Sequence, residues 1–263
     1  MSEAKVIAIT NQKGGVAKST TTVNLGVGLS KLGKKVLVID ADPQGSLSVS
    51  LGIRNPDELE ASLSTLMQSV IEDEPLDKEN ILFHHEEGID LIPSNIELSG
   101  IEISLFNVMS RELILKNCIK HFKESYDYIL IDCMPSLGLM TINALAAADS
   151  IIIPSQPNFL STKGLNLLLR SIAKFKRQIN PALSIDGILL TMVNGRTNNA
   201  KNISASLRES VGGGIRVFDT EIPHSVRIPE SSIEGKSIFA YDRNCKAAMA
   251  YEAFSKEVVS IEK

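Results

Sequence analysis

A glycine-rich segment near the start of the chain combines the residue types that hold phosphate groups. It reads Asn-Gln-Lys-Gly-Gly-Val-Ala-Lys-Ser-Thr over residues 11–20. An apolar run at residues 6–9 precedes it, and apolar residues at helical spacing follow it. Glycines between a strand and a helix let backbone N–H groups converge on phosphate oxygens, and the helix N-terminus adds a positive field. Lys18 would then reach the β- and γ-phosphates, and the Ser19 hydroxyl would be a ligand of Mg²⁺. The segment predicts a nucleotide site.

Two other apolar runs end in carboxylates. Residues 35–39 lead to Asp40 and Asp42, whose spacing of two places both on one side of an extended chain. Residues 126–131 lead to Asp132 in the pattern of a Walker B strand, whose carboxylate holds Mg²⁺ through water. Since α/β sheets place their ligands at the carboxyl ends of strands, we expect these carboxylates beside the glycine-rich segment. The alternative for Asp40 and Asp42 is a pair of solvated turn residues.

The strict phosphate-binding pattern G-x-x-x-x-G-K-[ST] is not met, because Gln12 and Ala17 stand where it has glycines. What remains resembles the deviant Walker A motif of the ParA/MinD family of P-loop ATPases. The resemblance implies that Lys13 reaches across a dimer interface to the partner's phosphates. It also implies that Asp42 positions the attacking water and that Asp40 supports the Mg²⁺ shell and the neighbouring lysine. An alanine suits position 17 only where the backbone does not need a positive φ, so we expect φ below zero there.

The resemblance extends over essentially the whole chain, which is most similar in its motifs to the short, Soj-type ParA proteins. Residues 133–138 resemble the family's switch II, with Met134 in place of a proline, and residues 222–242 resemble its C-terminal loop, which approaches the dimer partner. The implied activity is ATP hydrolysis with weak intrinsic turnover, with ATP and Mg²⁺ as cofactors. The implied catalytic residues are Lys13, Lys18 and Asp42, and the implied metal contacts are Ser19, Asp40 and Asp132. The implied nucleotide contacts are Gly14, Gly15, Val16, Ala17, Lys18, Ser19, Thr20, Asn194 and Pro223.

Apolar runs alternate with helical periodicity along the rest of the chain. This pattern predicts a single α/β domain over residues 1–263, a doubly wound, mostly parallel sheet of seven strands with helices on both faces. No separate N-terminal helix-turn-helix domain is expected. Helices are expected from Asn55 onward for about four turns, over residues 161–178 and over residues 246–261. Cys118 is expected to be buried, and His84 and His85 lack the second ligand cluster that a metal site needs.

Charge and composition limit the classes of function. The formal net charge is −4, so no global basic field recruits nucleic acid, and any DNA contact must come from a local patch. No apolar run reaches the roughly 18 residues of a membrane span, and the N-terminus does not read as a secretory signal. The 3 cysteines are odd in number and far apart, which fits a reducing cytoplasm. We expect no membrane partner and a cytoplasmic, nucleoid-associated protein.

The sequence is compatible with more than one function. The first is a partition ATPase that forms an ATP-sandwiched homodimer, binds DNA without sequence preference and hydrolyses ATP when a ParB/Spo0J-like activator stimulates it, for chromosome or plasmid segregation. The alternative is a MinD-like membrane-positioning switch, which the mixed charge of the last predicted helix disfavours. An iron-cluster carrier would need paired cysteines in glycine-rich surroundings. A non-hydrolysing regulator would lack Lys18 or Asp42, and both are present.

DNA contacts are predicted at Arg196 and Arg227. Both arginines lie in loops that match the places where Soj-like relatives carry DNA-contacting arginines. The alternative is that each caps a carbonyl or pairs with a nearby carboxylate. A cluster of Lys174, Lys176 and Arg177 is a weaker candidate, because cations that complement the dipole at a helix C-terminus explain it as well.

Overall fold

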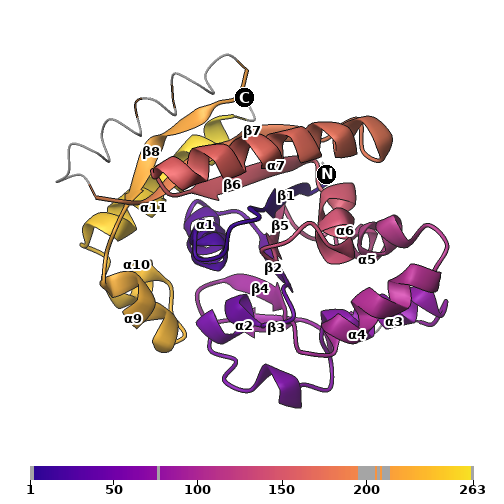
Figure 1. The fold of residues 1–263 in the computed structure, drawn as a ribbon. Coiled ribbons are helices and arrows are strands. Elements are labelled where there is room, and N and C mark those ends of the chain that lie inside the picture. Colours follow the sequence, from indigo (N-terminus) through magenta and orange to yellow (C-terminus); the bar gives the residue numbers. More distant parts are fainter. Residues whose placement is uncertain (1–2, 76–77, 195–204, 206–207, 209–213, 262–263) are drawn as a thin grey trace.

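The strands of the computed structural model form one sheet that runs through the molecule (Figure 1). The structure describes residues 3–75, 78–194, 205, 208 and 214–261. Over these residues the sheet has 8 strands in the order β3-β4-β2-β5-β1-β6-β7-β8, and only β3 runs antiparallel to its neighbour. The strands are β1 Lys5–Ile9, β2 Val36–Ala41, β3 Phe83–His85, β4 Ile89–Ile92, β5 Tyr128–Cys133, β6 Ser150–Ser155, β7 Ser184–Val193 and β8 Val217–Pro223.

Helices cover both faces of this sheet. The helices are α1 Lys18–Lys31, α2 Ser46–Ser50, α3 Leu63–Ile71, α4 Leu98–Ser104, α5 Ile114–Lys120, α6 Leu139–Ala147, α7 Phe159–Gln178, α9 Arg227–Ile233, α10 Ile238–Tyr241 and α11 Lys246–Ser260. One apolar core packs α3 to α7 against the first face, and a second core packs α1, α2, α10 and α11 against the other. The predicted α/β fold class, a doubly wound and mostly parallel sheet, is confirmed.

Two predictions about individual elements are wrong. The sheet has one strand more than expected, because β3 is only 3 residues long and its sequence, Phe-His-His, has no apolar run. The helix expected from Asn55 begins instead at Leu63, after a single 3-10 turn at Pro56–Glu58. Ser62 and Thr65 form the capping box that starts this helix, and such reciprocal bonds satisfy two backbone donors at once.

Two predictions, the burial of Cys118 and the extent of the long basic helix, are confirmed. Cys118 is fully buried in the first core. Helix α7 covers the expected residues, and its apolar stripe of Leu165, Leu168 and Ile172 is buried. His84 binds Asp90 across the antiparallel pair, with 2.5 Å between the imidazole Nδ1 and the carboxylate Oδ1. In the described part of the chain no three His, Cys, Asp or Glu side chains gather into a metal centre, and no helix is long and apolar enough to cross a membrane.

Candidate nucleotide site

The glycine-rich loop, residues 10–17, connects β1 to α1 and is held from two neighbouring strands. The Asn11 side-chain amide donates to a β6 backbone carbonyl over 2.7 Å. From the end of β6, Gln156 Nε2 donates to the Gly15 carbonyl over 3.0 Å. From β7, the buried Thr191 hydroxyl donates to the Val16 carbonyl, also over 3.0 Å. Side chains at the carboxyl ends of β6 and β7 therefore fix the shape of a loop that lacks two of the usual glycines.

Ala17 adopts a left-handed backbone conformation, with φ of 67° and ψ of 38°. The expectation of a negative φ was wrong. Ala17 is the N-cap residue of α1, and its carbonyl accepts the first helical hydrogen bond, from the Thr21 amide over 2.9 Å. The chain must turn sharply there to leave the loop and enter the helix. The strict motif places a glycine at this position, and an L-residue in the left-handed region costs roughly 1–2 kcal/mol.

Asp132 and Asp40 lie side by side at the carboxyl edge of the sheet. They are paired in register on the adjacent parallel strands β5 and β2, and both are fully buried. Burial and the neighbouring Asp40 charge raise the pKa of Asp132 well above its usual range, while the Ser19 hydroxyl and the Lys18 ammonium act in the opposite direction. Thr22 contacts Asp132 Oδ1 at 3.4 Å, but Oδ2 has no hydrogen-bond partner among the described residues.

The unpartnered Asp132 Oδ2 is available to bind a cation. A buried carboxylate without a partner is costly, and Mg²⁺ prefers carboxylate and hydroxyl oxygens as ligands. The Asp132 carboxylate is close enough to Ser19 for the hydroxyl to influence its pKa. The chemistry of Asp132 and Ser19 therefore fits the divalent cation that the sequence predicted.

Asp40 has a second set of contacts that sequence reasoning missed. Its Oδ2 accepts hydrogen bonds from the Ser48 amide and hydroxyl over 2.9 and 2.8 Å, and its Oδ1 accepts one from the Asp42 amide over 3.3 Å. Burial raises the pKa of Asp40 to about 6 even so. The carboxylate ties the end of β2 to α2. Asp42 is partly exposed and accepts a hydrogen bond from the Gln44 amide over 3.0 Å, which fixes the turn after β2.

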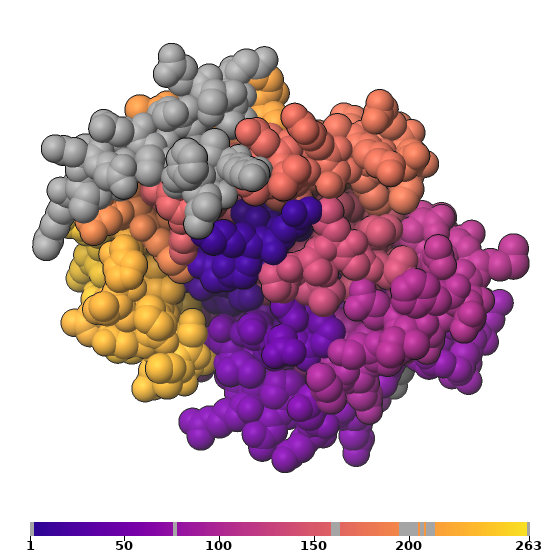
Figure 2. Space-filling model, in the orientation of Figure 1, coloured from indigo at the N-terminus to yellow at the C-terminus, as the bar shows by residue number. Residues whose placement is uncertain are grey.

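A hollow of about 480 Å³ opens beside the glycine-rich loop. Ala17, Thr20 and Pro223 contribute to its wall, and Asn194 is not among the lining residues. The lining is Ala17, Thr20, Thr191, Met192, Ile222, Pro223, His224, Ser225, Val226, Ile228, Pro229, Ser232, Ile233 and Tyr251. In Figure 2 the indigo N-terminal part of the chain is visible beside the yellow C-terminal part that supplies much of this wall. The hollow suits a flat, largely apolar group placed next to bound phosphates.

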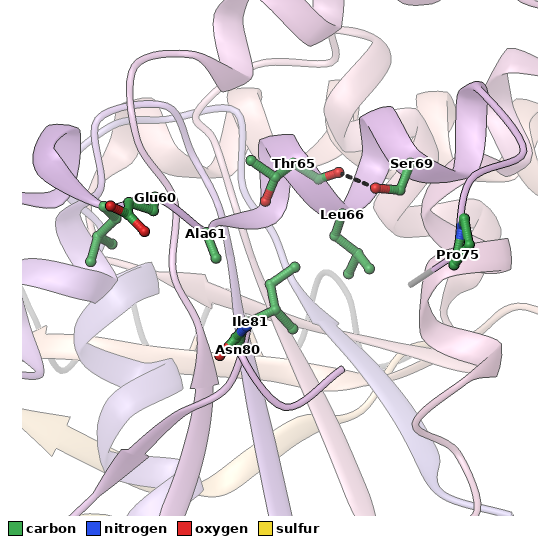
Figure 3. Close-up of a pocket in the computed structure, with 9 residues that line it drawn as sticks. Glu60, Ala61, Thr65, Leu66, Ser69, Pro75, Asn80 and Ile81 are labelled. Atoms are coloured by element: carbon green, nitrogen blue, oxygen red, sulfur yellow. Dashed lines mark hydrogen bonds between the residues drawn. The ribbon is translucent and has the colours of Figure 1, made fainter. Parts of the chain in front are cut away.

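Another hollow, of about 520 Å³, lies away from the loop, between α3 and the residues Pro75, Asn80 and Ile81 (Figure 3). Thr65, Leu66 and Ser69 face it from α3, and Glu60 is its only charged lining residue in the described chain. Neither the glycine-rich loop nor the carboxylates at the ends of β2 and β5 contribute to its lining. Of these two hollows, the one beside Ala17 adjoins the predicted nucleotide site.

The other candidate residues are more dispersed. Lys18 is buried with only 8% of its surface exposed, whereas Lys13 is exposed on the loop. Arg227 pairs with Glu230 over 3.2 Å and with Asp242 over 3.7 Å, which is the alternative expected for it, although its side chain stays 52% exposed. Arg196 lies outside the described residues.

Comparison with known proteins agrees with this geometry. A family model described as an AAA domain matches residues 4–185. The sporulation initiation inhibitor protein Soj of Bacillus subtilis is 41% identical over 97% of this chain and 98% of its own. The chromosome partitioning protein ParA of Caulobacter vibrioides is 37% identical over 98% of this chain and 95% of its own. This chain is also similar to a crystal structure of cobyrinic acid a,c-diamide synthase from Mycobacterium smegmatis with bound ADP and magnesium. The two structures superpose with a TM-score of 0.84 at 32% sequence identity, and the match covers 97% of this chain and 94% of the other. The chain therefore belongs to the Soj/ParA family of chromosome-partitioning ATPases.

Proposed function

We propose that this protein is an ATP-driven partition switch. It binds ATP with Mg²⁺ at the glycine-rich loop, forms a homodimer around two nucleotides and binds DNA in that state. Hydrolysis, stimulated by a ParB-like activator, returns it to the monomer. The unpartnered Asp132 oxygen beside Ser19 and Lys18 carries the nucleotide part of this proposal. The Soj and ParA relatives, which match nearly the whole chain, support the partition role.

The site residues divide the work of phosphoryl transfer to water. Lys18 neutralises the β- and γ-phosphate charge, and the N–H groups of residues 14–20 cradle the phosphates at the helix N-terminus. Ser19 and Asp132 would hold Mg²⁺, which would neutralise negative charge on the phosphate oxygens. Asp42, partly exposed at the end of β2, accepts a hydrogen bond from the attacking water and orients it. The exposed Lys13 contacts the phosphates bound by the partner subunit.

The contacts of Asp40 favour a supporting role over direct metal binding. Ser48 occupies one of its oxygens with two hydrogen bonds, and the Asp42 amide contacts the other. Asp40 thus positions the turn that carries Asp42, and it adds negative charge next to Asp132 for the cation to offset. In the hollow, Pro223 would pack on the adenine base, whereas Asn194, which follows β7, lies outside the lining of the hollow.

The structure gives little support to the membrane-switch alternative. A membrane-surface helix needs a free apolar face and a polar face rich in Lys and Arg. In α11 the apolar residues Tyr251, Phe254 and Val258 are fully buried in the second core. On its outer side, Glu252 pairs with Lys256 over 2.7 Å. This helix docks on the sheet.

ATP-dependent DNA binding by the purified protein tests the proposal. We expect the parent protein to bind duplex DNA with ATP but not with ADP. The Lys18→Ala variant should lose nucleotide binding, because the phosphates lose their main cation. The Asp42→Ala variant should keep ATP binding and stay dimeric on DNA, because only the positioning of water is lost. Lys13→Ala should impair dimerisation and turnover more than nucleotide affinity.

Each assay has a result that would contradict the proposal. Light scattering should report the dimer, and phosphate release should report turnover, with Lys34→Ala as a control that removes a lysine remote from the loop in sequence. Parental turnover in Asp42→Ala would remove its assigned role. Equal DNA binding with ATP and ADP would rule out a nucleotide switch. ATP-dependent sedimentation with anionic vesicles, without DNA binding, would favour the membrane switch.

A further inference from the structure

Helix α7 has an unusual charge composition for a protein of net charge −4. Its 20 residues contain Lys163, Arg170, Lys174, Lys176 and Arg177 but neither Asp nor Glu. A surface helix normally mixes both signs, and cations that only complement the helix dipole need to occupy no more than the last turn. Arg170 lies two turns before the end of α7. The helix dipole alone therefore does not account for this helix.

Four of these cations are exposed to solvent and available to a ligand. Leu165, Leu168 and Ile172 pack into the first core, so the helix presents its opposite face outward. Arg170, Lys174, Lys176 and Arg177 are all exposed. No ion pair within the described chain involves any of them, although the same chain pairs Lys5, Lys256, Arg208 and Arg227 with carboxylates.

The carboxylate nearest in sequence to the end of α7 is already engaged. Asp186, at the start of β7, binds Lys5 over 2.9 Å and accepts a hydrogen bond from the Ser150 hydroxyl over 2.7 Å. The positive charge of α7 therefore stays uncompensated on this surface. An unpaired cluster of one sign at a surface raises the local concentration of counter-charged ligands.

These cations border a groove in the surface, and hydrogen bonds to α6 hold the end of α7 beside it in place. Arg170, Ala173, Lys176, Arg177 and Pro181 line an open groove of about 640 Å³. Next to Pro181, the Asn180 side-chain amide donates to the carbonyls of Leu145 and Ala148 over 3.0 and 2.8 Å. These bonds fasten the end of α7 to the end of α6. The groove is thus part of the packed framework.

We propose that this basic groove of α7 binds the phosphate backbone of DNA and contributes more to DNA affinity than Arg227 does. The inference rests on the proposed DNA-binding function. Arg170, Lys174 and Arg177 recur along one side of the helix over about 10 Å, a length over which duplex DNA presents about six phosphate charges. Cations spread along a line suit a charged polymer better than a single small anion. The positive charge of Arg227, by contrast, is partly neutralised by its ion pairs with Glu230 and Asp242.

The place of the groove also separates DNA contact from nucleotide chemistry. Helix α7 leaves the carboxyl end of β6 and returns to the start of β7, so its basic end lies at the edge of the sheet opposite the glycine-rich loop. The groove is therefore already formed in this structure, and its shape does not depend on a rearrangement of the nucleotide site. Dependence on ATP arises because a dimer presents two grooves, and contacts made by both copies add on one duplex.

Charge removal in the groove tests this inference. The test variant is Arg170→Gln, Lys176→Gln and Arg177→Gln together, and the matched control is Lys34→Gln, Lys116→Gln and Lys120→Gln. Both remove the same charge from solvent-accessible positions, and circular dichroism together with ATP-dependent dimerisation checks that each variant folds. Affinity for a duplex of mixed sequence is measured with ATP across a salt series. Arg227→Ala is measured alongside.

Each phosphate contact contributes about 0.9 to the slope of log affinity against log salt. Loss of three contacts should lower that slope by about 2.7 per protomer and weaken binding at least about tenfold at about 0.1 M salt. The control variant should keep the parental slope, and Arg227→Ala should change it less than the groove variant does. The charge-keeping variant Arg170→Lys, Lys176→Arg and Arg177→Lys should show the parental slope.

Two results would overturn the groove while leaving the proposed function intact. One is a groove variant with parental affinity and slope, and the other is a larger loss in Arg227→Ala than in the groove variant. If the groove variant instead loses binding to anionic vesicles and keeps its DNA affinity, the groove is a lipid-binding surface and the inference is wrong. A parent protein that binds no DNA with ATP would overturn the proposed function itself, and with it this inference.

Discussion

Replacing Ala17 with glycine tests whether the glycine-rich loop stores backbone strain. Ala17 holds φ of 67° at the N-cap of α1. An L-residue there costs roughly 1–2 kcal/mol, and glycine avoids that cost. Glycine also makes the unfolded chain more flexible, which lowers stability by roughly 0.4–1 kcal/mol. The balance predicts that Ala17→Gly leaves the free energy of unfolding unchanged or raises it by up to about 1.5 kcal/mol.

Ala250→Gly is the matched control, because Ala250 lies within α11 in the right-handed helical region. Glycine in a helix interior costs about 1 kcal/mol relative to alanine, so this variant should be destabilised by that amount. Urea unfolding without nucleotide, followed by circular dichroism, measures both changes. The two variants should therefore differ by roughly 1–2.5 kcal/mol in favour of Ala17→Gly.

A loss of about 1 kcal/mol in Ala17→Gly, equal to that of the control, would refute the strain argument. The nucleotide affinity of Ala17→Gly should stay close to the parental value, because glycine adopts the same φ and the phosphate-facing N–H groups are unchanged. A large gain in affinity would show instead that the loop relaxes into its left-handed form only when nucleotide binds.

Two further predictions concern packing and the thiols. Gly28→Ala should lower the free energy of unfolding by about 1–3 kcal/mol, because the new Cβ would lie 2.0 Å from the Ser255 hydroxyl. Adding Ser255→Ala to this variant should recover part of the loss. If urea unfolding shows no loss of stability in Gly28→Ala, the close packing of α1 against Ser255 is contradicted. Gly100→Ala, whose Cβ meets nothing within 4 Å, is the control and should not be destabilised. Burial raises the pKa of the Cys118 thiol to about 12, so the reactive thiolate is absent until the pH approaches that value. Iodoacetamide at neutral pH, read by mass spectrometry, should therefore modify the partly exposed Cys245 first and Cys118 only in denaturant; early modification of Cys118 would contradict its burial.

The local sequence was sufficient to predict a nucleotide site. It singles out Lys18, Ser19 and Asp132 because their residue types and positions at strand and helix ends are what phosphate and Mg²⁺ chemistry requires. The sheet was predictable because buried parallel strands read as continuous apolar runs, as in β2 and β5. Strand β3 was missed because a short strand at the edge of a sheet, with Phe83 partly and His84 largely exposed, carries no such run.

Only the tertiary structure decided how the loop and the charges are used. The left-handed Ala17 follows from the angle at which the loop enters α1, and residue type alone favours the opposite sign of φ. Gln156 and Thr191 hold the loop from β6 and β7, far away in sequence, so no local pattern could indicate them. The ion pairs of Arg227 and the unpaired cations of α7 likewise depend on which carboxylates the fold brings near. The sequence by itself determined which groups can bind phosphate and Mg²⁺. Their partners were set by long-range packing, because a side chain's charge is available to a ligand only where the fold leaves it uncompensated.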